Sequence, residues 1–344
     1  MIEVSLHPDH ETVGDAAHLT LPASRWEILE ALAQAGIPSL DDCHIEITLP
    51  PLMPQAQECI NDIPQQAGFF DALNYFAHCL SDLSEGDHSL LNGAAAIHRP
   101  TNMRTMLNLV WHLDSIVVGE AGCDEKLGRF LVENDFVSFP EEALPYLDYA
   151  RVGERHRASH LCTFAGRVYY EDTDPVIEAV FDESLMCEIP QWAFRAELCH
   201  VDAPAEDSPT VTLELPAFPQ DITSALADLG TATMEDVRIV DCQSHIPTIQ
   251  FFKGVQLSEL VECADLLTGM DDDDYIKFLA VAEYEHWWQL SDIIPGLKKL
   301  ADYDFTPQSL LLEAQGSYGV VFTIDPGPAL TSDCQMEHQM GGLA

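Results

Sequence analysis

Apolar residues recur at helical spacing in a segment that follows a short alternating stretch near the start of the chain. Residues 19–36 read LTLPASRWEILEALAQAG. The apolar positions that share one helix face there are Ile28, Ala31, Leu32 and Ala35. Ser24 is a typical N-cap and Gly36 is a typical helix stop. The pattern therefore predicts a short strand followed by a helix between these two residues.

The same pattern returns later in the chain. Residues 213–230 read LELPAFPQDITSALADLG and share nine residues with the first segment at an offset of 194. These are Leu213, Leu215, Pro216, Ala217, Ile222, Ala225, Leu226, Ala227 and Gly230. At the same offset, the acidic pair Asp41-Asp42 corresponds to Glu235-Asp236. The shared apolar, turn and acidic positions indicate a duplicated β-α-β element.

A second match, at an offset of 187, aligns residues 71–97 with residues 258–284. Each segment has two apolar stripes of helical spacing that are separated by an acidic elbow. The elbows contain Asp82, Glu85 and Asp87 in the first segment and Asp271, Asp272, Asp273 and Asp274 in the second. A third helix is predicted after each pair, over 101–114 and 288–301. The predicted unit is thus β-α-β followed by a small helical cluster, and it occurs twice.

These patterns predict an α+β fold, an elongated tandem of small α/β domains in which the β-α-β plus helical-cluster unit is duplicated. A length of 344 residues suits two or three domains. The predicted parts are an N-terminal α/β domain at 1–65, a helical and α+β region at 66–170, a connecting segment at 171–210 and a second copy of the unit at 211–344.

The charge changes this picture, because the chain carries 58 acidic residues and only 15 Lys and Arg residues, a net charge of −43. Hydrophobic residues still make up 47% of the chain, which is enough for a folded core. Such a charge excludes a protein that binds nucleic acid directly by neutralising phosphates. It also argues against docking on an anionic membrane, and no apolar run approaches the roughly 20 residues that span a bilayer.

The acidic residues are unevenly distributed. Residues 99–167 have a net charge of −2, whereas the blocks around them are strongly acidic. Those blocks are residues 1–98 at −14, residues 168–237 at −15 and residues 238–344 at −12. Self-repulsion of this size costs folding free energy, so we expect the acidic surface to have a use.

Signals for cofactors, metals and catalysis are absent from the sequence. Ten cysteines are scattered without a CxxC pair, and no phosphate loop, nucleophile elbow or HExxH pair occurs. The N-terminal MIEVSLHPDHE has no basic segment followed by an apolar one, so no export signal is expected there. We therefore predict a cytoplasmic protein with free thiols that is not an enzyme and has neither cofactor nor metal ion.

Residues 70–170 contain a series of motifs. They are LNYFAHCLSDLS at 73–84, MLNLVWHLDSIVV at 106–118, DEKLGRFLVEN at 124–134, PEEALPYLDYARVGERHR at 140–157 and CTFAGRVYY at 162–170. In sequence and order, these motifs resemble the ArdA family of antirestriction proteins. The resemblance covers about 100 of the 344 residues.

The resemblance implies a function without catalysis. Proteins of the ArdA family are elongated dimers of small α/β domains, and their surface carboxylates imitate the phosphates of bent duplex DNA. They occupy the DNA-binding groove of type I restriction–modification enzymes, so that incoming DNA is not cleaved. For this chain, the resemblance implies a homodimeric inhibitor whose partner is a type I restriction–modification enzyme.

Candidate partner-binding carboxylates are those that are repeated in both copies or clustered at elbows, together with an acidic run near residue 172. They are Asp41, Asp42, Glu85, Asp87, Glu171, Asp172, Asp174, Glu235, Asp236, Asp271, Asp272, Asp273 and Asp274. For each of them the alternative is an ordinary solvated acid or a helix N-cap. A calcium loop at the aspartate run is disfavoured, because the D-x-D-x-D-G spacing with a distal Glu is missing.

The near-neutral block is a candidate surface for self-association, because two chains with a net charge of −43 each repel elsewhere. Arg151, Arg155 and Arg157 are candidate contacts within it. His156 and His160 lie four residues apart and could share a helix face as metal ligands. Beside three arginines, we interpret this pair as part of a charged surface or interface.

Two other classes of function stay open. An acidic adaptor or chaperone could hold a basic nucleic-acid-binding protein without imitating the geometry of duplex DNA. A halophilic or otherwise acidic enzyme is a third hypothesis, which the missing catalytic motifs and the near-neutral block disfavour. A DNA mimic differs from both because it blocks a type I enzyme at near-stoichiometric amounts.

Overall fold

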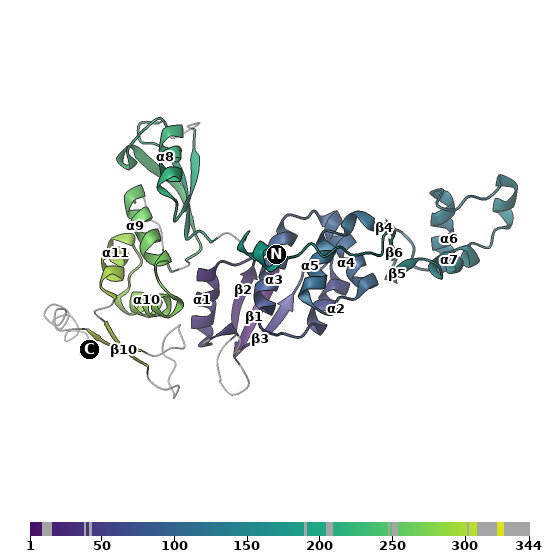
Figure 1. The fold of residues 1–344 in the computed structure, drawn as a ribbon, viewed down its shortest axis with the longest axis horizontal. Coiled ribbons are helices and arrows are strands. Elements are labelled where there is room, and N and C mark those ends of the chain that lie inside the picture. The colour runs from purple at the N-terminus through teal and green to yellow at the C-terminus, as the bar shows by residue number, and fades with distance from the viewer. Residues whose placement is uncertain are drawn as a thin grey trace, which may run out of the picture. The chain divides into compact units, whose positions relative to one another are not determined.

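The computed structural model describes residues 1–8, 16–37, 39–40, 43–188, 191–203, 209–246, 248–249, 254–300, 303–307 and 322–326. It divides into two compact units. The first consists of Met1–Ser5, His18–Pro22 and His44–Ile189, and the second of Leu6–Ala17, Ala23–Cys43 and Pro190–Ala344. Helices are mixed with small three-stranded antiparallel sheets, so the predicted α+β class is confirmed (Figure 1). The predicted boundaries of the four parts stay a prediction.

The first sheet has the strand order β2-β1-β3 and is formed by β1 (Ile2–Pro8), β2 (Ala17–Leu21) and β3 (Cys43–Thr48). Side chains along β1 and β3 alternate between buried and more exposed positions, as expected when one face of a sheet is covered. Four helices follow in the chain: α2 (Pro54–Asp62), α3 (Phe69–Ser81), α4 (Glu85–His98) and α5 (Met103–Val110). Helix α2 packs on α4, and α3 packs on α5.

A second sheet in the first unit has the order β4-β6-β5 and is antiparallel throughout. Its strands are β4 (Ile116–Gly119), β5 (Leu161–Ala165) and β6 (Val168–Asp172). Helix α4 packs against this sheet, and α6 (Asp124–Glu133) packs against α7 (Tyr149–Arg157). Three 3-10 turns also belong to this unit: η2 (Leu113–Ser115), η3 (Glu141–Tyr146) and η4 (Glu183–Glu188).

Helices α6 and α7 approach each other through two glycines. A Cβ atom on Gly128 would lie 1.9 Å from the carbonyl oxygen of Tyr149, and one on Gly153 would lie 2.0 Å from the carbonyl oxygen of Asp124. Both obstacles are backbone atoms, so no larger residue fits without moving a helix. The guanidinium of Arg157 on α7 also links the two helices, because it donates to both carboxylate oxygens of Asp124 on α6, at 2.7 and 3.0 Å.

The sheet of the second unit has the order β8-β7-β9 and consists of β7 (Phe194–His200), β8 (Val211–Leu215) and β9 (Val237–Ser244). Strand β7 pairs antiparallel with both neighbours. The helices are α8 (Pro219–Asp228), α9 (Leu257–Thr268), α10 (Asp272–Glu285) and α11 (Leu290–Lys298), and the 3-10 turn η5 (Met234–Asp236) precedes β9. A separate antiparallel pair is formed by β10 (Tyr303–Pro307) and β11 (Phe322–Pro326).

Helix α1 (Arg25–Ala35) packs against α10 within the second unit. As predicted, Ser24 caps it: the Ser24 hydroxyl accepts the backbone N–H of Glu27, and the carboxylate of Glu27 accepts the Ser24 N–H at 2.8 Å. Gly36 ends the helix in the left-handed conformation, with φ at 66°. The predicted limits of this helix are therefore confirmed.

The chain passes twice through a similar order of elements. The first pass is β1-β2-α1-β3 followed by α2, α3, α4 and α5, and the second is β7-β8-α8-β9 followed by α9, α10 and α11. The helices predicted on both sides of each acidic elbow, and the third helix after each pair, are present. The central strands β1 and β7 were missed, because their sequences IEVSLHP and FRAELCH share little. The duplication itself stays a prediction.

None of the helices in the described part of the chain has the length and apolar character that crossing a bilayer requires. Eight cysteines whose side chains the structure describes are free thiols, of which Cys199 and Cys263 are buried and Cys123 is exposed. Burial raises the pKa of Cys263 to about 12, so this thiol is uncharged at neutral pH and packs as an apolar side chain.

A carboxyl group is also buried in the second unit. Glu30 of α1 is only 5% exposed, and its Oε1 accepts the hydroxyl of Thr248 at 3.1 Å. Its second oxygen, Oε2, has no hydrogen-bond partner among the described residues. Burial raises the pKa of Glu30 to about 6, although the hydrogen bonds from Thr248 act in the opposite direction.

Replacing Glu30 by Gln should change how stability depends on pH. Because the pKa is raised in the folded protein, the stability contributed by Glu30 is complete below its ordinary pKa of 4.5 and is lost as the pH rises through about 6. Relative to the wild type, Glu30→Gln should therefore gain about 1 kcal/mol of unfolding free energy between pH 5 and pH 8. Urea unfolding of both proteins at the two pH values measures this gain, and a pH-independent difference would contradict it.

Candidate functional site

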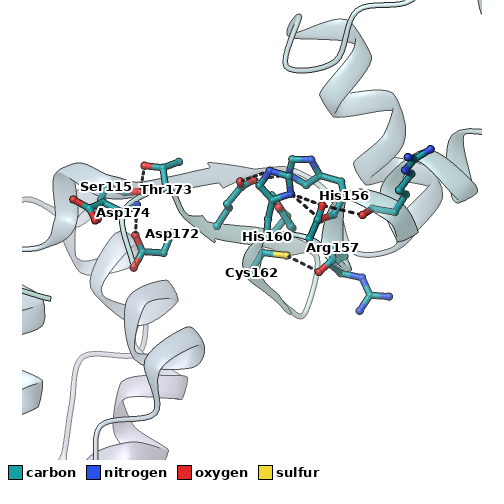
Figure 2. Close-up of polar contacts among 12 residues, drawn as sticks. Ser115, His156, Arg157, His160, Cys162, Asp172, Thr173 and Asp174 are labelled. Atoms are coloured by element: carbon teal, nitrogen blue, oxygen red, sulfur yellow. Dashed lines mark hydrogen bonds and ion pairs between the residues drawn. The ribbon is translucent and has the colours of Figure 1, made fainter. Parts of the chain in front are cut away.

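Strand β6 carries two consecutive acidic residues, Glu171 and Asp172, whose side chains point to opposite faces because side chains alternate along a strand. Both residues are buried, at 7% and 4% exposure. A buried carboxylate needs hydrogen bonds or an opposite charge, and each of these two is contacted by two histidines, of which Figure 2 labels His156 and His160. We call the group of His98, His112 and Asp172 the first cluster and the group of His156, His160 and Glu171 the second cluster.

In the first cluster, two imidazoles converge on one oxygen. Nε2 of His98 lies 2.6 Å and Nε2 of His112 lies 2.8 Å from Oδ2 of Asp172. The other oxygen, Oδ1, accepts the backbone N–H of Asp174 at 3.0 Å. Burial would raise the pKa of Asp172, but the hydrogen bonds from His112 and His98 outweigh it and hold the pKa below its ordinary value. The cluster ties the end of α4 and the start of η2 to β6.

In the second cluster, the carboxylate is held from two sides. Nε2 of His156 lies 2.8 Å from Oε2 of Glu171, and the hydroxyl of Tyr169 donates to the same oxygen at 2.7 Å. Nε2 of His160 lies 4.0 Å from the other oxygen, Oε1. The two imidazole rings are stacked, with centroids 3.8 Å apart and planes 11° apart. Burial and the hydrogen bonds to Cys162 and Glu171 raise the pKa of Tyr169 far above its ordinary range.

Both clusters combine two imidazole nitrogens with a carboxylate oxygen, a donor set that suits transition-metal cations. The sequence indicated His156 and His160 as a pair, but it gave no third member for them and no sign of the first cluster. The only local signal is the run Tyr-Tyr-Glu-Asp in β6, in which two acidic residues follow two aromatic ones inside a strand.

Glu171 and Asp172 were predicted as partner-binding carboxylates, but in the structure both side chains are buried in the protein. Their side chains are 9% and 0% exposed and are engaged by histidines. They were expected at the surface because runs of acidic residues are usually solvated. Their partners come from elsewhere in the chain, so we leave both out of the candidate surface.

Three other predicted carboxylates accept hydrogen bonds from nearby backbone N–H or hydroxyl groups. Asp87 forms the capping box of α4, where its Oδ2 accepts the N–H and the hydroxyl of Ser84 at 3.1 and 2.7 Å. Asp271 is the N-cap of α10. Asp236 accepts two threonine hydroxyls, at 2.9 and 2.7 Å. Of these three, only Asp271 is the helix N-cap that the alternative interpretation expected, and all three remain accessible at the surface.

The other predicted carboxylates that the structure describes are at least partly accessible. Asp272 accepts Nε of Arg25 at 2.8 Å, and Asp274 is paired with Nζ of Lys277 at 2.8 Å, which offsets both charges. The exposed members are Glu85, Asp174, Glu235, Asp272 and Asp273, whereas Asp41 and Asp42 lie outside the described residues. The predicted set is thus a mixture of structural and surface groups.

A larger acidic surface is carried by residues 44–98, which we call the acidic segment. It contains seven acidic residues and no Lys or Arg, and six of the seven are exposed. The six are Glu46, Glu58, Asp62, Asp71, Asp82 and Glu85. Of these six, only Glu85 was predicted from the sequence, because that prediction favoured repeated or clustered positions. The signal that could have found the others is the absence of Lys and Arg between Arg25 and Arg99.

The three predicted self-association arginines differ in their surroundings. Arg151 and Arg155 are exposed one turn apart on α7. Arg157 binds Asp124 and lies 5.3 Å from the ring centroid of Phe164, so it has a role within the fold. The segment between α6 and α7 exposes three large apolar side chains, which are Phe136 at 52%, Phe139 at 37% and Tyr146 at 88%.

No protein-family model, curated protein or solved structure gives a significant match to this chain. The resemblance to the ArdA family rests on the five sequence motifs and stays a prediction. The features of the described residues that bear on function are therefore the acidic segment, the exposed surface around α7 and the two histidine–carboxylate clusters.

Removing Asp172 should destabilise the first unit strongly, because two imidazoles would lose their acceptor in a buried site. We expect Asp172→Ala to lower the unfolding free energy by about 2–6 kcal/mol, because each of two buried donors left without an acceptor costs about 1–3 kcal/mol. The exposed neighbour supplies the control: Asp174→Ala should change it by about 0.5 kcal/mol or less. Urea unfolding measures both values, and equal stability of the two variants would show that the first cluster has no structural role.

Proposed function

We propose that this protein is an antirestriction inhibitor that imitates duplex DNA and occupies the DNA-binding groove of a type I restriction–modification enzyme. The observation that carries the proposal is the acidic segment, in which six exposed carboxylates occur without a Lys or Arg residue. Such a surface attracts a groove lined by Lys and Arg. The first of the ArdA-like motifs, at 73–84, lies within this segment. In this role the protein catalyses no reaction.

The charge is large enough for this role. Duplex DNA carries one charge per about 1.7 Å, so 43 net charges correspond to at most about 73 Å of helix axis. Glu30, Glu171 and Asp172 are buried, which reduces the usable number. The acidic segment contributes its whole charge, because it contains no basic residue of the Lys or Arg type.

The finer features of the architecture belong to the same proposal. We infer that the β-α-β plus helical-cluster unit is duplicated and that the chain is an elongated tandem of small domains, as the ArdA resemblance implies. Support comes from the matching order of elements and from the two sheets in which the first strand in sequence is central. The free thiols support a cytoplasmic location, where reducing conditions preserve them.

A DNA-protection assay with purified type I enzyme tests the function. The wild-type chain should block cleavage of unmodified DNA at near-stoichiometric amounts, and competing duplex DNA or added salt should relieve the block. Neutralising five acidic-segment residues should raise the amount needed for half inhibition at least about tenfold, because each lost charge weakens attraction to the cationic groove. The five changes are Glu58→Gln, Asp62→Asn, Asp71→Asn, Asp82→Asn and Glu85→Gln.

A matched variant controls for total charge. It removes five exposed carboxylates that lie outside both the acidic segment and the segment from α6 to α7, by Glu120→Gln, Glu178→Gln, Asp221→Asn, Asp228→Asn and Asp241→Asn. This variant should inhibit nearly as well as the wild type. Equal loss in both variants would contradict a specific role of the acidic segment. A chain that binds basic proteins broadly but leaves the type I enzyme active would support the adaptor alternative.

We further propose that the chain forms a homodimer through the surface around α7. The near-neutral block avoids the repulsion that two acidic surfaces would produce. Exposed apolar side chains between α6 and α7 offer contact area, and Arg151 and Arg155 offer positive charge beside them in sequence. Aromatic and arginine side chains are enriched at protein interfaces.

Light scattering after size exclusion tests the dimer. The wild type should elute with the mass of two chains, and Arg151→Glu combined with Arg155→Glu should shift it towards one chain. The control is Arg167→Glu, which changes an exposed arginine in the turn between β5 and β6 and should leave the mass unchanged. A wild-type chain that is monomeric at all concentrations tested would end this part of the proposal.

A further inference from the structure

The second cluster places three ligating groups within reach of one ion. One ring nitrogen of His156, one ring nitrogen of His160 and a carboxylate oxygen of Glu171 all lie within 4.8 Å of one another. The nitrogen–oxygen separations are 2.8 Å for His156 and 4.0 Å for His160. Ligands of a tetrahedral zinc ion, with bonds of about 2.0–2.1 Å, lie about 3.3 Å apart. The observed separations bracket that value. Because the two imidazole rings are stacked with planes only 11° apart, coordination requires one of the rings to turn.

A hydrogen bond on the far side of His160 determines which of its nitrogens carries a proton. Its Nδ1 lies 2.8 Å from the backbone carbonyl oxygen of His156. A carbonyl oxygen only accepts, so Nδ1 carries the hydrogen and the neutral ring keeps a lone pair on Nε2. This lone pair faces Oε1 of Glu171, which is also an acceptor. A cation placed between these two acceptors would bind both of them.

Tyr169 holds the carboxylate of Glu171 in a fixed orientation. The tyrosine is completely buried, and its hydroxyl donates to Oε2 at 2.7 Å. Metal sites typically orient their ligands in this way, through hydrogen bonds from a second layer of residues. A ligating imidazole there donates its other N–H to a backbone carbonyl, as His160 does.

The first cluster lacks an unsatisfied pair of acceptors. Both of its imidazoles direct Nε2 at one oxygen of Asp172 at hydrogen-bond distance, so two N–H donors satisfy the carboxylate. Its histidine side chains are 11% and 9% exposed, whereas that of His160 is 44% exposed. An ion from solvent can therefore reach the second cluster more easily.

We propose that His156, His160 and Glu171 bind a divalent transition-metal cation of the zinc class. Two imidazole nitrogens and one carboxylate oxygen suit this class, whereas Ca²⁺ and Mg²⁺ prefer oxygen ligands. Three protein ligands leave a fourth tetrahedral position for water on the exposed side of His160. The bound ion joins the end of α7 to strand β6. This site is independent of the proposed inhibition of a restriction enzyme.

Zinc titration of the full chain, stripped of metal by a chelator, tests the proposal. In calorimetry at pH 8, the wild type should show a Zn²⁺-binding event. His160→Ala should lower the Zn²⁺ affinity at least about 100-fold, because the loss of a residue that only orients a ligand typically lowers metal affinity by about 10–100-fold. Tyr169→Phe keeps the ring and removes the orienting hydroxyl, so it should weaken the same event about tenfold. In ¹⁵N-labelled wild type, saturating Zn²⁺ should shift the Nε2 resonances of His156 and His160.

The matched control is His18→Ala, which removes an exposed imidazole on β2 outside both clusters and should leave zinc binding unchanged. Circular dichroism of the metal-free variants verifies that they fold. The proposal is overturned if the wild type binds no zinc, or if His160→Ala binds it as tightly as the wild type does. It is also overturned if Nε2 of His160 stays protonated at saturating zinc, because the cation between the two groups would then be a proton.

Discussion

Two negative charges buried on adjacent residues of one strand constrain the second sheet of the first unit. Because Glu171 and Asp172 face opposite sides of β6, each side must supply its own hydrogen-bond donors. Helix α4 and turn η2 supply them to Asp172, and α7 supplies one to Glu171. Without these histidines, Glu171 would keep only the hydroxyl of Tyr169 and Asp172 only the backbone N–H of Asp174 as donors among the residues that the structure describes, so the strand positions helices on both of its faces.

The packing around β6 follows the same alternation. Tyr170 shares the face of Asp172, and a Cβ atom on Gly93 of α4 would lie 2.0 Å from the Tyr170 ring, so the helix meets the sheet where it has no side chain. Tyr169 shares the face of Glu171 and belongs to a small core with Leu127 and Leu131 of α6. Each face of β6 thus carries one tyrosine, whose ring packs against neighbouring residues, and one carboxylate, which contacts histidine.

Among the described residues, histidines rather than Lys or Arg residues contact these two buried carboxylates, and Lys and Arg are scarce in this chain. The chain has 14 histidines against 15 Lys and Arg residues combined, while the acidic residues number 58. A neutral imidazole donates a hydrogen bond to a carboxylate without cancelling its charge. Buried carboxylates can therefore be satisfied while the protein keeps nearly all of its negative charge.

Local features of the fold could be predicted from sequence, and distant contacts could not. Ser24 and Gly36 mark the ends of α1 because capping depends on residues within one turn. Asp172, in contrast, is 74 residues from His98 and 60 from His112, so nothing near it in sequence indicates that it is buried. The pairing of His156 with His160 followed from spacing, but Glu171 reaches them only through the return of the chain along β6.

The acidic segment also has a consequence for the solution around the protein. Exposed carboxylates without Lys or Arg among them gather sodium or potassium ions, and the layer they form is about 10 Å deep at 0.1 M salt and about 30 Å deep at 0.01 M. When such a surface meets a basic groove, these ions return to the bulk together with the anions held by the groove. Much of the driving force for association then resides in the entropy of released ions, and it is set by the salt of the medium as much as by the contacts themselves.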